Sequence, residues 1–229
     1  PFIGISKQIG QQGLVLALGV YGPSSPVHVT FPETVTVGGT AGVEAPQRYE
    51  LISRDVILLN PTLAVAYDLG HGLRVGAGFQ WTIATLGFVT YANLGGGTED
   101  AGGDMRIALR VSDWFIPGAI ASVQYQPIER LQFGATFRWS DQLYGGGEAR
   151  VTDSMGVSSD PTPTATLRVP FPLTFRAGVR YRHPRWGAPT GGDPMATELF
   201  DIELDGLYET GSNVSSFDVT LSGNVPGLA

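Results

Sequence analysis

Residues 73–91 read LRVGAGFQWTIATLGFVTY, and apolar side chains occupy almost every second position of this stretch. The odd positions run from Leu73 through Phe79 and Trp81 to Tyr91, whereas the even positions are mostly small, polar or charged. Alternation with a period of two is typical of a β-strand whose two faces meet different surroundings. The stretch therefore predicts a long strand with one apolar face and one more polar face.

The same alternation recurs along the chain, most clearly in residues 131–140, 171–182 and 200–209. Tight turns at 7–13, 68–72 and 126–130 alternate with longer connections rich in Gly, Pro and Thr, at 23–47, 93–103 and 145–163. This order predicts an antiparallel up-and-down meander of about eight strands. The expected strands cover residues 1–7, 14–22, 48–67, 73–93, 103–125, 131–151, 163–181 and 198–221.

The composition excludes several classes of protein. The 229 residues include no cysteine, which excludes a disulfide scaffold and a thiolate metal site. A net charge of −7 leaves no basic surplus for binding nucleic acid. Only 15% of the residues are charged, where about a quarter is usual. We therefore expect something other than water to contact much of the surface.

The length of the expected strands points to a membrane. Several run to about 20 residues, whereas a soluble strand has roughly 5–6 and a tilted strand crosses a bilayer with about 9–11. Tyr67, Tyr125 and Tyr181 each lie just before a tight turn or break, where they would form an aromatic girdle at the membrane interface. We predict one all-β domain, residues 1–229, forming part of a transmembrane antiparallel β-barrel in the bacterial outer membrane. A soluble β-sandwich is the alternative.

The more polar face would line the lumen of such a barrel. Arg176, Arg180 and Arg182 alternate along one expected strand. Asp201, Glu203 and Asp205 alternate along the next. Opposite charges on neighbouring strands attract each other, so we predict an arginine–carboxylate network in the wall. Further arginines expected on this face are Arg74, Arg106, Arg110 and Arg138.

No pattern in the sequence indicates catalysis or metal binding. His28, His71 and His183 are isolated, and no two of them have metal-ligand spacing. The serines form no Gly-x-Ser-x-Gly nucleophile elbow. We therefore predict no enzyme, no cofactor and no metal site.

Three segments resemble the FadL/TodX family of outer-membrane channels: LNPTLAVAY at 59–67 with LRVGAGF at 73–79, GLVLALGVYGP at 13–23, and VPFPLTFRAGVRY at 169–181. The likeness extends from about residue 1 to residue 208. It implies a 14-stranded barrel that carries long-chain fatty acids, aromatic hydrocarbons or other hydrophobic compounds, with an N-terminal hatch and a side opening. Neither the hatch nor the family's terminal aromatic residue is found, so we expect an excerpt that lacks both ends.

The expected function is passive uptake of a hydrophobic compound such as a long-chain fatty acid. Candidate ligand contacts are Leu86 and Phe88, apolar residues on the inner face, and Phe31, in an extracellular segment that would capture the ligand first. The expected partners are membrane lipid, lipopolysaccharide and the hydrophobic ligand, with no nucleic acid. Two alternatives stay open: a structural or adhesive outer-membrane protein that binds a protein partner through its long loops, and a general porin.

Overall fold

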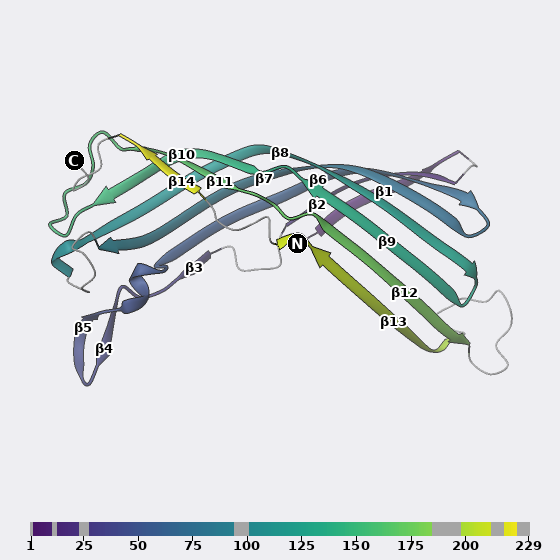
Figure 1. Cartoon of the computed structure of the whole chain (residues 1–229), viewed down its shortest axis with the longest axis horizontal. Helices are drawn as coiled ribbons and strands as arrows, with labels where there is room; N and C mark the ends of the chain where they lie inside the picture. Colours follow the sequence, from purple (N-terminus) through teal and green to yellow (C-terminus); the bar gives the residue numbers. More distant parts are fainter. Residues whose placement is uncertain are drawn as a thin grey trace.

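The computed structural model describes residues 2–10, 13–22, 28–93, 101–184, 198–211 and 218–223. Its main feature is one antiparallel sheet of long strands (Figure 1). The strands of this sheet are β1 (Phe2–Ile9), β2 (Leu14–Tyr21), β3 (His28–Thr30), β6 (Ser53–Gly70), β7 (Leu73–Asn93), β8 (Asp104–Ile128), β9 (Leu131–Ser140), β10 (Leu143–Thr152), β11 (Thr164–Val169), β12 (Thr174–Pro184), β13 (Glu198–Glu209) and β14 (Asp218–Ser222).

The remaining elements are small. A separate hairpin consists of β4 (Thr34–Val37) and β5 (Thr40–Glu44), and it stands apart from the main sheet at the lower left of Figure 1. Two short 3-10 helices are η1 (Pro46–Tyr49) and η2 (Ala101–Gly103). Among the described residues, no helix has the length and apolar character needed to cross a membrane.

Most strands of the sheet pair with a strand that directly precedes or follows them in the chain. The order β1-β2-β6-β7-β8 is continued by β9-β12-β13 along one half of β8 and by β10-β11-β14 along its other half. We call the half that carries the tight turns the lower half and the other the upper half. The predicted all-β, antiparallel, up-and-down architecture is confirmed. The described strands form an open sheet, in which no pairing joins β1 to β13 or β14.

Three expected strands are divided, and here the prediction was wrong. Residues 131–151 form β9 and β10, residues 163–181 form β11 and β12, and residues 198–221 contain β13 and β14. Pro170 and Pro172 lie between β11 and β12, where they cannot donate ladder hydrogen bonds. The expected connection at 23–47 also contains the short strands β3, β4 and β5, and the one at 145–163 begins later, because β10 continues to Thr152.

The breaks lie at similar heights on neighbouring strands. On β6, pairing with β7 is interrupted at Asn60 and Pro61. The register between β7 and β8 shifts between Thr82 and Ala84. The gaps between β9 and β10 and between β11 and β12 continue this line across the sheet. We call the line the crease, and the long strands arch along their length in Figure 1.

The two faces of the sheet can be told apart by what packs on them. Thr90 Oγ1 on β7 contacts the carbonyl oxygens of Arg48 (3.3 Å) and Tyr49 (3.2 Å), so η1 covers the upper end of the face that carries Thr90. We call this the inner face. Because side chains alternate along a strand, Gln80, Leu86 and the other even positions of β7 share it.

The crease changes which residues of β8 face inward. Above it, Leu109 and Val111 pair with Phe88 and Leu86, whereas below it Ile116 pairs with Thr82. The inner positions are therefore odd above the shift and even below it, as expected for a β-bulge. Between them, Trp114 and Phe115 are 71% and 60% exposed.

Candidate functional site

The upper half of the inner face is mostly apolar, although Arg54 of β6 lies on it opposite Phe88. Its buried members gather on β7, β8, β10 and β11, and partly buried side chains pack around them. We call this set the apolar patch: Ala84, Leu109, Val111, Ile116, Leu143, Ala149, Ala165 and Leu167, with Leu58, Leu86, Phe88, Val169, Phe171 and Leu221 around them. Burial of a Leu, Val or Phe side chain stabilises a fold by about 1.5–3 kcal/mol, so the patch also holds the upper half together.

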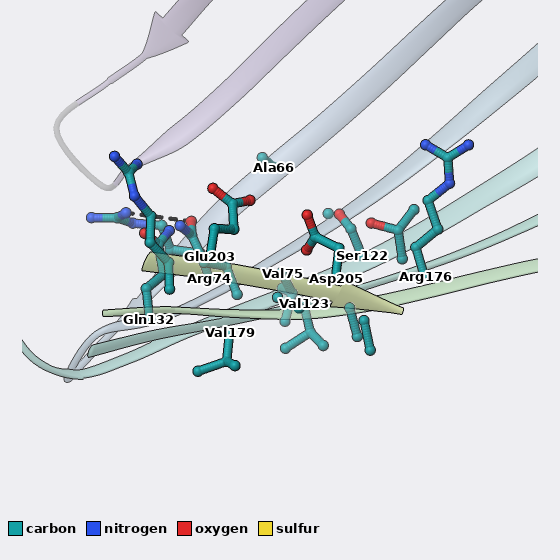
Figure 2. A pocket seen from close by; sticks show the side chains of 18 residues that line it. Ala66, Arg74, Val75, Ser122, Val123, Gln132, Arg176, Val179, Glu203 and Asp205 are labelled. Atoms are coloured by element: carbon teal, nitrogen blue, oxygen red, sulfur yellow. Dashed lines mark hydrogen bonds between the residues drawn. The ribbon is translucent and has the colours of Figure 1, made fainter. Parts of the chain in front are cut away.

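The lower half of the inner face is polar. A hollow of about 500 Å³ opens there, and its charged lining comes from β7, β12 and β13. Figure 2 shows Arg176, Glu203 and Asp205 on one side of the strands and Val123 and Val179 on the other. The same strands therefore present charge to the inside and hydrocarbon to the outside.

The predicted arginines and carboxylates of β12 and β13 share this inner surface, and some of them are in contact. Arg180 Nε donates to Asp201 Oδ2 at 2.8 Å, although the residue directly opposite Arg180 is Glu203. Arg182 Nη1 lies 3.5 Å from Glu198 Oε1. Within the described part of the chain, Arg176, Glu203 and Asp205 form no ion pair. The stabilising effect expected of this network stays a prediction.

A cluster of buried polar side chains lies at the crease. Gln80 Nε2 and Thr82 Oγ1 both donate to Asn60 Oδ1 at 2.7 Å, and Tyr21 Oη donates to Gln80 Oε1 at 2.7 Å. Gln80 is only 1% exposed. Buried polar groups are stable when they satisfy one another, as these do. This polar cluster therefore separates the apolar patch above from the charged surface below.

One arginine reaches the polar cluster from across the inner face. The Arg138 guanidinium on β9 lies 5.9 Å from the centre of the Tyr21 ring on β2. Three strands, β6, β7 and β8, lie between them in the sheet. A cation over an aromatic face is attracted by the ring quadrupole.

The outer face has the opposite distribution. In the lower half it exposes a band of aliphatic and aromatic side chains: Leu16, Leu18, Leu63, Val65, Tyr67, Val75, Phe79, Val123, Tyr125, Phe133, Phe137, Trp139, Phe175 and Tyr181. In the upper half, Arg110 lies opposite Glu148 on this face. Arg106 and Arg110, expected in the lumen, pair with Tyr91 and Gly87 and so face outward, because the shift on β8 exchanges its faces.

The height of the outer apolar band matches a membrane. Phe115, beside the crease, and Tyr125, beside the tight turn, are 10 residues apart on β8. That is about 33 Å of strand, or about 25 Å after a tilt near 40°, the height of the apolar band of outer-membrane barrels. Phe79, whose ring centroid lies 6.0 Å from that of Trp81 and 6.4 Å from that of Phe115, joins an aromatic cluster at the upper edge of the band.

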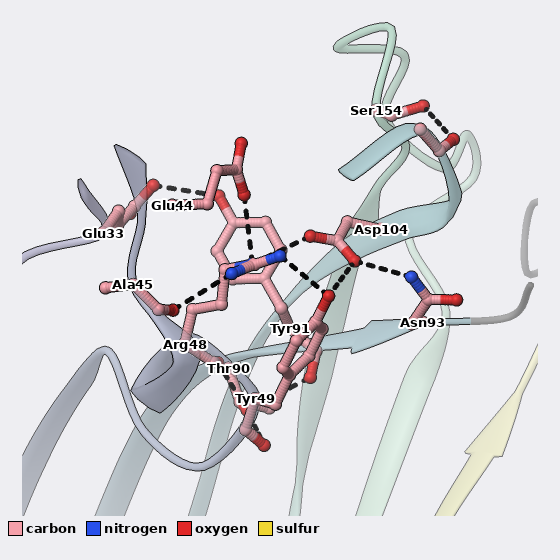
Figure 3. A network of polar contacts seen from close by, with 11 residues as sticks. Glu33, Glu44, Ala45, Arg48, Tyr49, Thr90, Tyr91, Asn93, Asp104 and Ser154 are labelled. Atoms are coloured by element: carbon pink, nitrogen blue, oxygen red, sulfur yellow. Dashed lines mark hydrogen bonds and ion pairs between the residues drawn. The ribbon is translucent and has the colours of Figure 1, made fainter. Parts of the chain in front are cut away.

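A second polar network fastens the connection between β2 and β6 to the upper end of the sheet (Figure 3). Arg48 of η1 and Asp104 of β8 are 2% and 4% exposed, and Arg48 Nε donates to Asp104 Oδ2 at 2.9 Å. Tyr49 Oη and Asn93 Nδ2 donate to the other carboxylate oxygen at 2.8 and 3.0 Å. Glu44 lies 3.0 Å from Arg48 Nε.

For the pKa of Asp104, the effect of hydrogen bonding outweighs the effect of burial. Burial acts to raise the pKa of Asp104, but the hydrogen bonds from Tyr49, Arg48 and Asn93 hold that pKa below its ordinary value. Burial likewise acts to lower the pKa of Arg48, and the contact with Asp104 keeps it raised. Both groups are therefore charged at neutral pH. Nothing in the sequence pattern marked this pair, since the two residues are 56 positions apart.

The structure separates the predicted ligand contacts into two groups. Leu86 and Phe88 pack against the buried members of the apolar patch. Phe31 lies outside the patch, between β3 and β4, where its backbone N–H donates to the Ile52 carbonyl at 2.7 Å and its side chain is exposed. The segment expected to capture the ligand covers residues 26–32, and its residues 26 and 27 lie outside the described residues. The other patch members were missed, although Leu109 and Val111 already alternate with Arg110 in the sequence.

His28 has partners, contrary to the expectation that it is isolated in a loop. It begins β3, and its Nδ1 lies 2.5 Å from Asp55 Oδ1 on the outer face. Its Nε2 lies 2.8 Å from Thr30 Oγ1. All three are on the solvent side of an exposed strand pair. Among the described residues, no group of three or more His, Asp or Glu side chains could hold a metal ion.

The comparison with known proteins finds solved structures with a similar fold. No family model matches the sequence, and no curated protein matches it. The fold is similar to the crystal structure of a Pseudomonas aeruginosa FadL homologue, with a TM-score of 0.71, 11% identity, and coverage of 97% of this chain and 51% of that chain. The likeness over most of the chain agrees with the resemblance seen in the sequence.

Two crystal structures of the Pseudomonas putida toluene transporter TodX are also similar. One has a TM-score of 0.63 at 13% identity and covers 96% of this chain and 56% of that chain. The other has a TM-score of 0.53 at 14% identity and covers 80% and 50%. The chain therefore spans about half the length of the structures it matches. At these identities the likeness establishes the fold, a sheet of the kind found in FadL and TodX barrels.

Proposed function

We propose that this chain forms part of an outer-membrane β-barrel channel for passive uptake of hydrophobic compounds such as long-chain fatty acids, with no covalent chemistry. The observation that carries the proposal is the exchange of polarity at the crease. Below it, the outer face is apolar and the inner face is charged. Above it, the outer face carries charged side chains such as Arg110 and Glu148 beside exposed apolar ones such as Ile57, and the inner face is mostly apolar.

Each half suits a different environment. The lower half matches a strand wall in contact with hydrocarbon, whose inner face meets water. The upper half would project beyond the membrane, where an apolar inner face offers a hydrophobic solute a place to leave water. The similarity of fold to a FadL homologue and to a toluene transporter supports this assignment.

Replacement of Phe88 with arginine tests the proposal. Phe88 is a partly buried member of the apolar patch, so a charge there should weaken binding of a fluorescent fatty acid by about tenfold or more, equivalent to at least about 1.4 kcal/mol. Val157→Arg is the matched control, because Val157 is exposed outside the patch. Equal binding by both variants and the wild type would remove Phe88 from the site.

One observation favours the adhesive alternative. The β4–β5 hairpin forms its own two-stranded sheet and exposes Val37. Exposed strand edges can pair with another chain. A variant that lacks residues 34–44 and still binds fatty acid would show that ligand binding does not depend on this hairpin. That result would separate uptake from adhesion. A general porin is distinguished by liposome swelling, since only a porin should admit sugars freely.

A further inference from the structure

A second hollow, of about 330 Å³, opens on the outer face above the crease. Its lining comes from β6, β7 and β8, and apart from Phe88 and Leu109 every residue that lines it occupies an outer position. Gly87 of β7 lies in the middle, directly opposite Asp55 of β6 on one side and Arg110 of β8 on the other. The hollow therefore lies between one negative and one positive side chain.

Gly87 keeps this space open. A Cβ atom at this position would lie 3.5 Å from the Asp55 Cβ and 3.7 Å from the Asp55 carbonyl oxygen, which is ordinary van der Waals contact. A side chain would therefore fit at this position but would occupy the hollow. Glycine within a strand often marks a site where a ligand approaches the backbone closely.

Both charged side chains keep capacity for further hydrogen bonds. His28 Nδ1 lies 2.5 Å from Asp55 Oδ1, whereas Asp55 Oδ2 takes no hydrogen bond from the described residues. Arg110 is exposed, and it forms no ion pair with a described residue although Glu148 lies directly opposite it. A carboxylate suits an ammonium group, and a guanidinium binds phosphate through paired hydrogen bonds.

The spacing of the two charges suits a small ligand that carries both signs. Asp55 and Arg110 are separated by one strand, so their backbones lie about 10 Å apart, two strand spacings. Both side chains border the same hollow and shorten that gap. A ligand whose ammonium and phosphate groups are joined by a short linker can therefore contact both residues at once.

An apolar track leads from the hollow down to the outer apolar band. The register of β6 on β7 is the same on both sides of the crease, so the odd positions of β6 face outward throughout. Ile57 and Leu59 are exposed on this track, and Leu63 of the band follows below the crease. Asp55 is two residues above Ile57, about 7 Å of strand, and the headgroup layer of a bilayer is roughly 5–7 Å thick on each side.

We infer that this hollow binds the head group of a phospholipid that carries both an ammonium and a phosphate group, as phosphatidylethanolamine does. Asp55 contacts the ammonium group and Arg110 the phosphate. The acyl chains lie over Ile57 and Leu59 and continue onto the outer apolar band. The site is on the outer wall, so lipid binding here is separate from the proposed uptake along the inner face.

Native mass spectrometry tests this site on the full chain, released from nanodiscs with equal amounts of phosphatidylethanolamine and phosphatidylglycerol that have identical acyl chains. Both lipids carry a phosphate, but only the first carries an ammonium group. Wild-type protein should retain phosphatidylethanolamine about three- to fivefold more than phosphatidylglycerol, the effect of one exposed charge pair. Asp55→Asn should bring this ratio to about 1, because the amide keeps the shape of the side chain and loses its charge.

Two further variants test the rest of the hollow. Arg110→Gln should lower the retained amount of both lipids, because both contact it through phosphate. Gly87→Val should do the same by filling the space, and a β-branched residue is well tolerated in a strand. Undiminished retention in both variants would overturn the site.

Asp218→Asn and Arg150→Gln are the matched controls, because both residues are exposed on the same face outside the hollow. Both should keep the wild-type ratio and the wild-type amounts. Equal retention of the two lipids by the wild type, or an unchanged ratio in Asp55→Asn, would overturn the inference. Fatty-acid binding by Asp55→Asn should equal that of the wild type, so the outcome here is distinguishable from failure of the proposed function.

Discussion

Asp104 is held by three donors at the upper end of the sheet, and this makes its contribution to stability depend on pH. Its pKa in the folded chain is lowered from the ordinary value of 3.8. The unfolded chain therefore binds more protons in the acid range, so stability rises with pH there. The contribution is fully present at neutral pH and is lost as the pH falls below about 3.8 toward the lowered pKa.

We expect acid to release η1 from the sheet before the lower half unfolds. The backbone amides of Glu50 and Leu51, which donate to the Gln47 carbonyl at 2.9 Å, report on η1. Their hydrogen-exchange protection factors should fall between pH 5 and pH 3, below the usual range of maximum stability. Asp104→Asn should show low protection at both pH values. Constant protection in the wild type would contradict this role for Asp104.

Asp113 takes over backbone hydrogen bonds where the ladder of β8 is interrupted. Its Oδ1 accepts from the Phe115 N–H at 3.1 Å and its Oδ2 from the Tyr144 N–H at 2.8 Å. Asp113→Ala leaves both donors without this acceptor, which should lower the free energy of unfolding by about 1–3 kcal/mol. Asp153→Ala is a suitable comparison, because Asp153 accepts two amides within a single exposed turn. A loss no greater than that of Asp153→Ala would argue against a bridging role.

Among the elements, β12 and β13 form only some of the ion pairs that their facing charges would allow. Arg180 contacts Asp201, whereas Asp205 has no ion-pair partner in the described part of the chain. We therefore expect Asp201→Leu, and the double change of Asp201 and Asp205 to Leu, to lower the melting temperature by similar amounts. Asp205→Leu alone should change it little. Both ends of the Arg180–Asp201 pair are 39% exposed, so the effect should shrink in high salt.

The strands also show what alternation can and cannot predict. Below the crease the pattern was sufficient: Phe79 and Val123 face outward, and Arg176 and Asp205 face inward, because an uninterrupted strand keeps its two faces. Above it, the same pattern misplaced Arg110. The run of Trp114, Phe115 and Ile116 is apolar throughout, so alternation alone does not say where the extra residue of the bulge lies.

The long-range parts of the candidate site were beyond sequence reasoning for a different reason. Arg138 lies near the Tyr21 ring although three strands separate the two residues in the sheet, and no spacing in the sequence marks such a contact. Leu86 and Phe88 were predictable as apolar exceptions on a polar face. Their neighbours on β10 and β11 were not predictable, because these neighbours depend on where the expected strands 131–151 and 163–181 are each divided into two.

For the molecule as a whole, we expect the crease to lie at the membrane–water interface that borders the upper edge of the outer apolar band. Trp81, Trp114 and Trp139 lie near it, on the outer face. Amphipathic aromatic rings favour the headgroup level, so in vesicles the fluorescence of these residues should be quenched strongly by lipids labelled near the headgroup and weakly by lipids labelled at the chain end. A Trp186→Phe background leaves only these three of the four tryptophans. Quenching by aqueous iodide without any lipid quenching would place the outer band in water, and with it both the membrane assignment and the uptake function would fail.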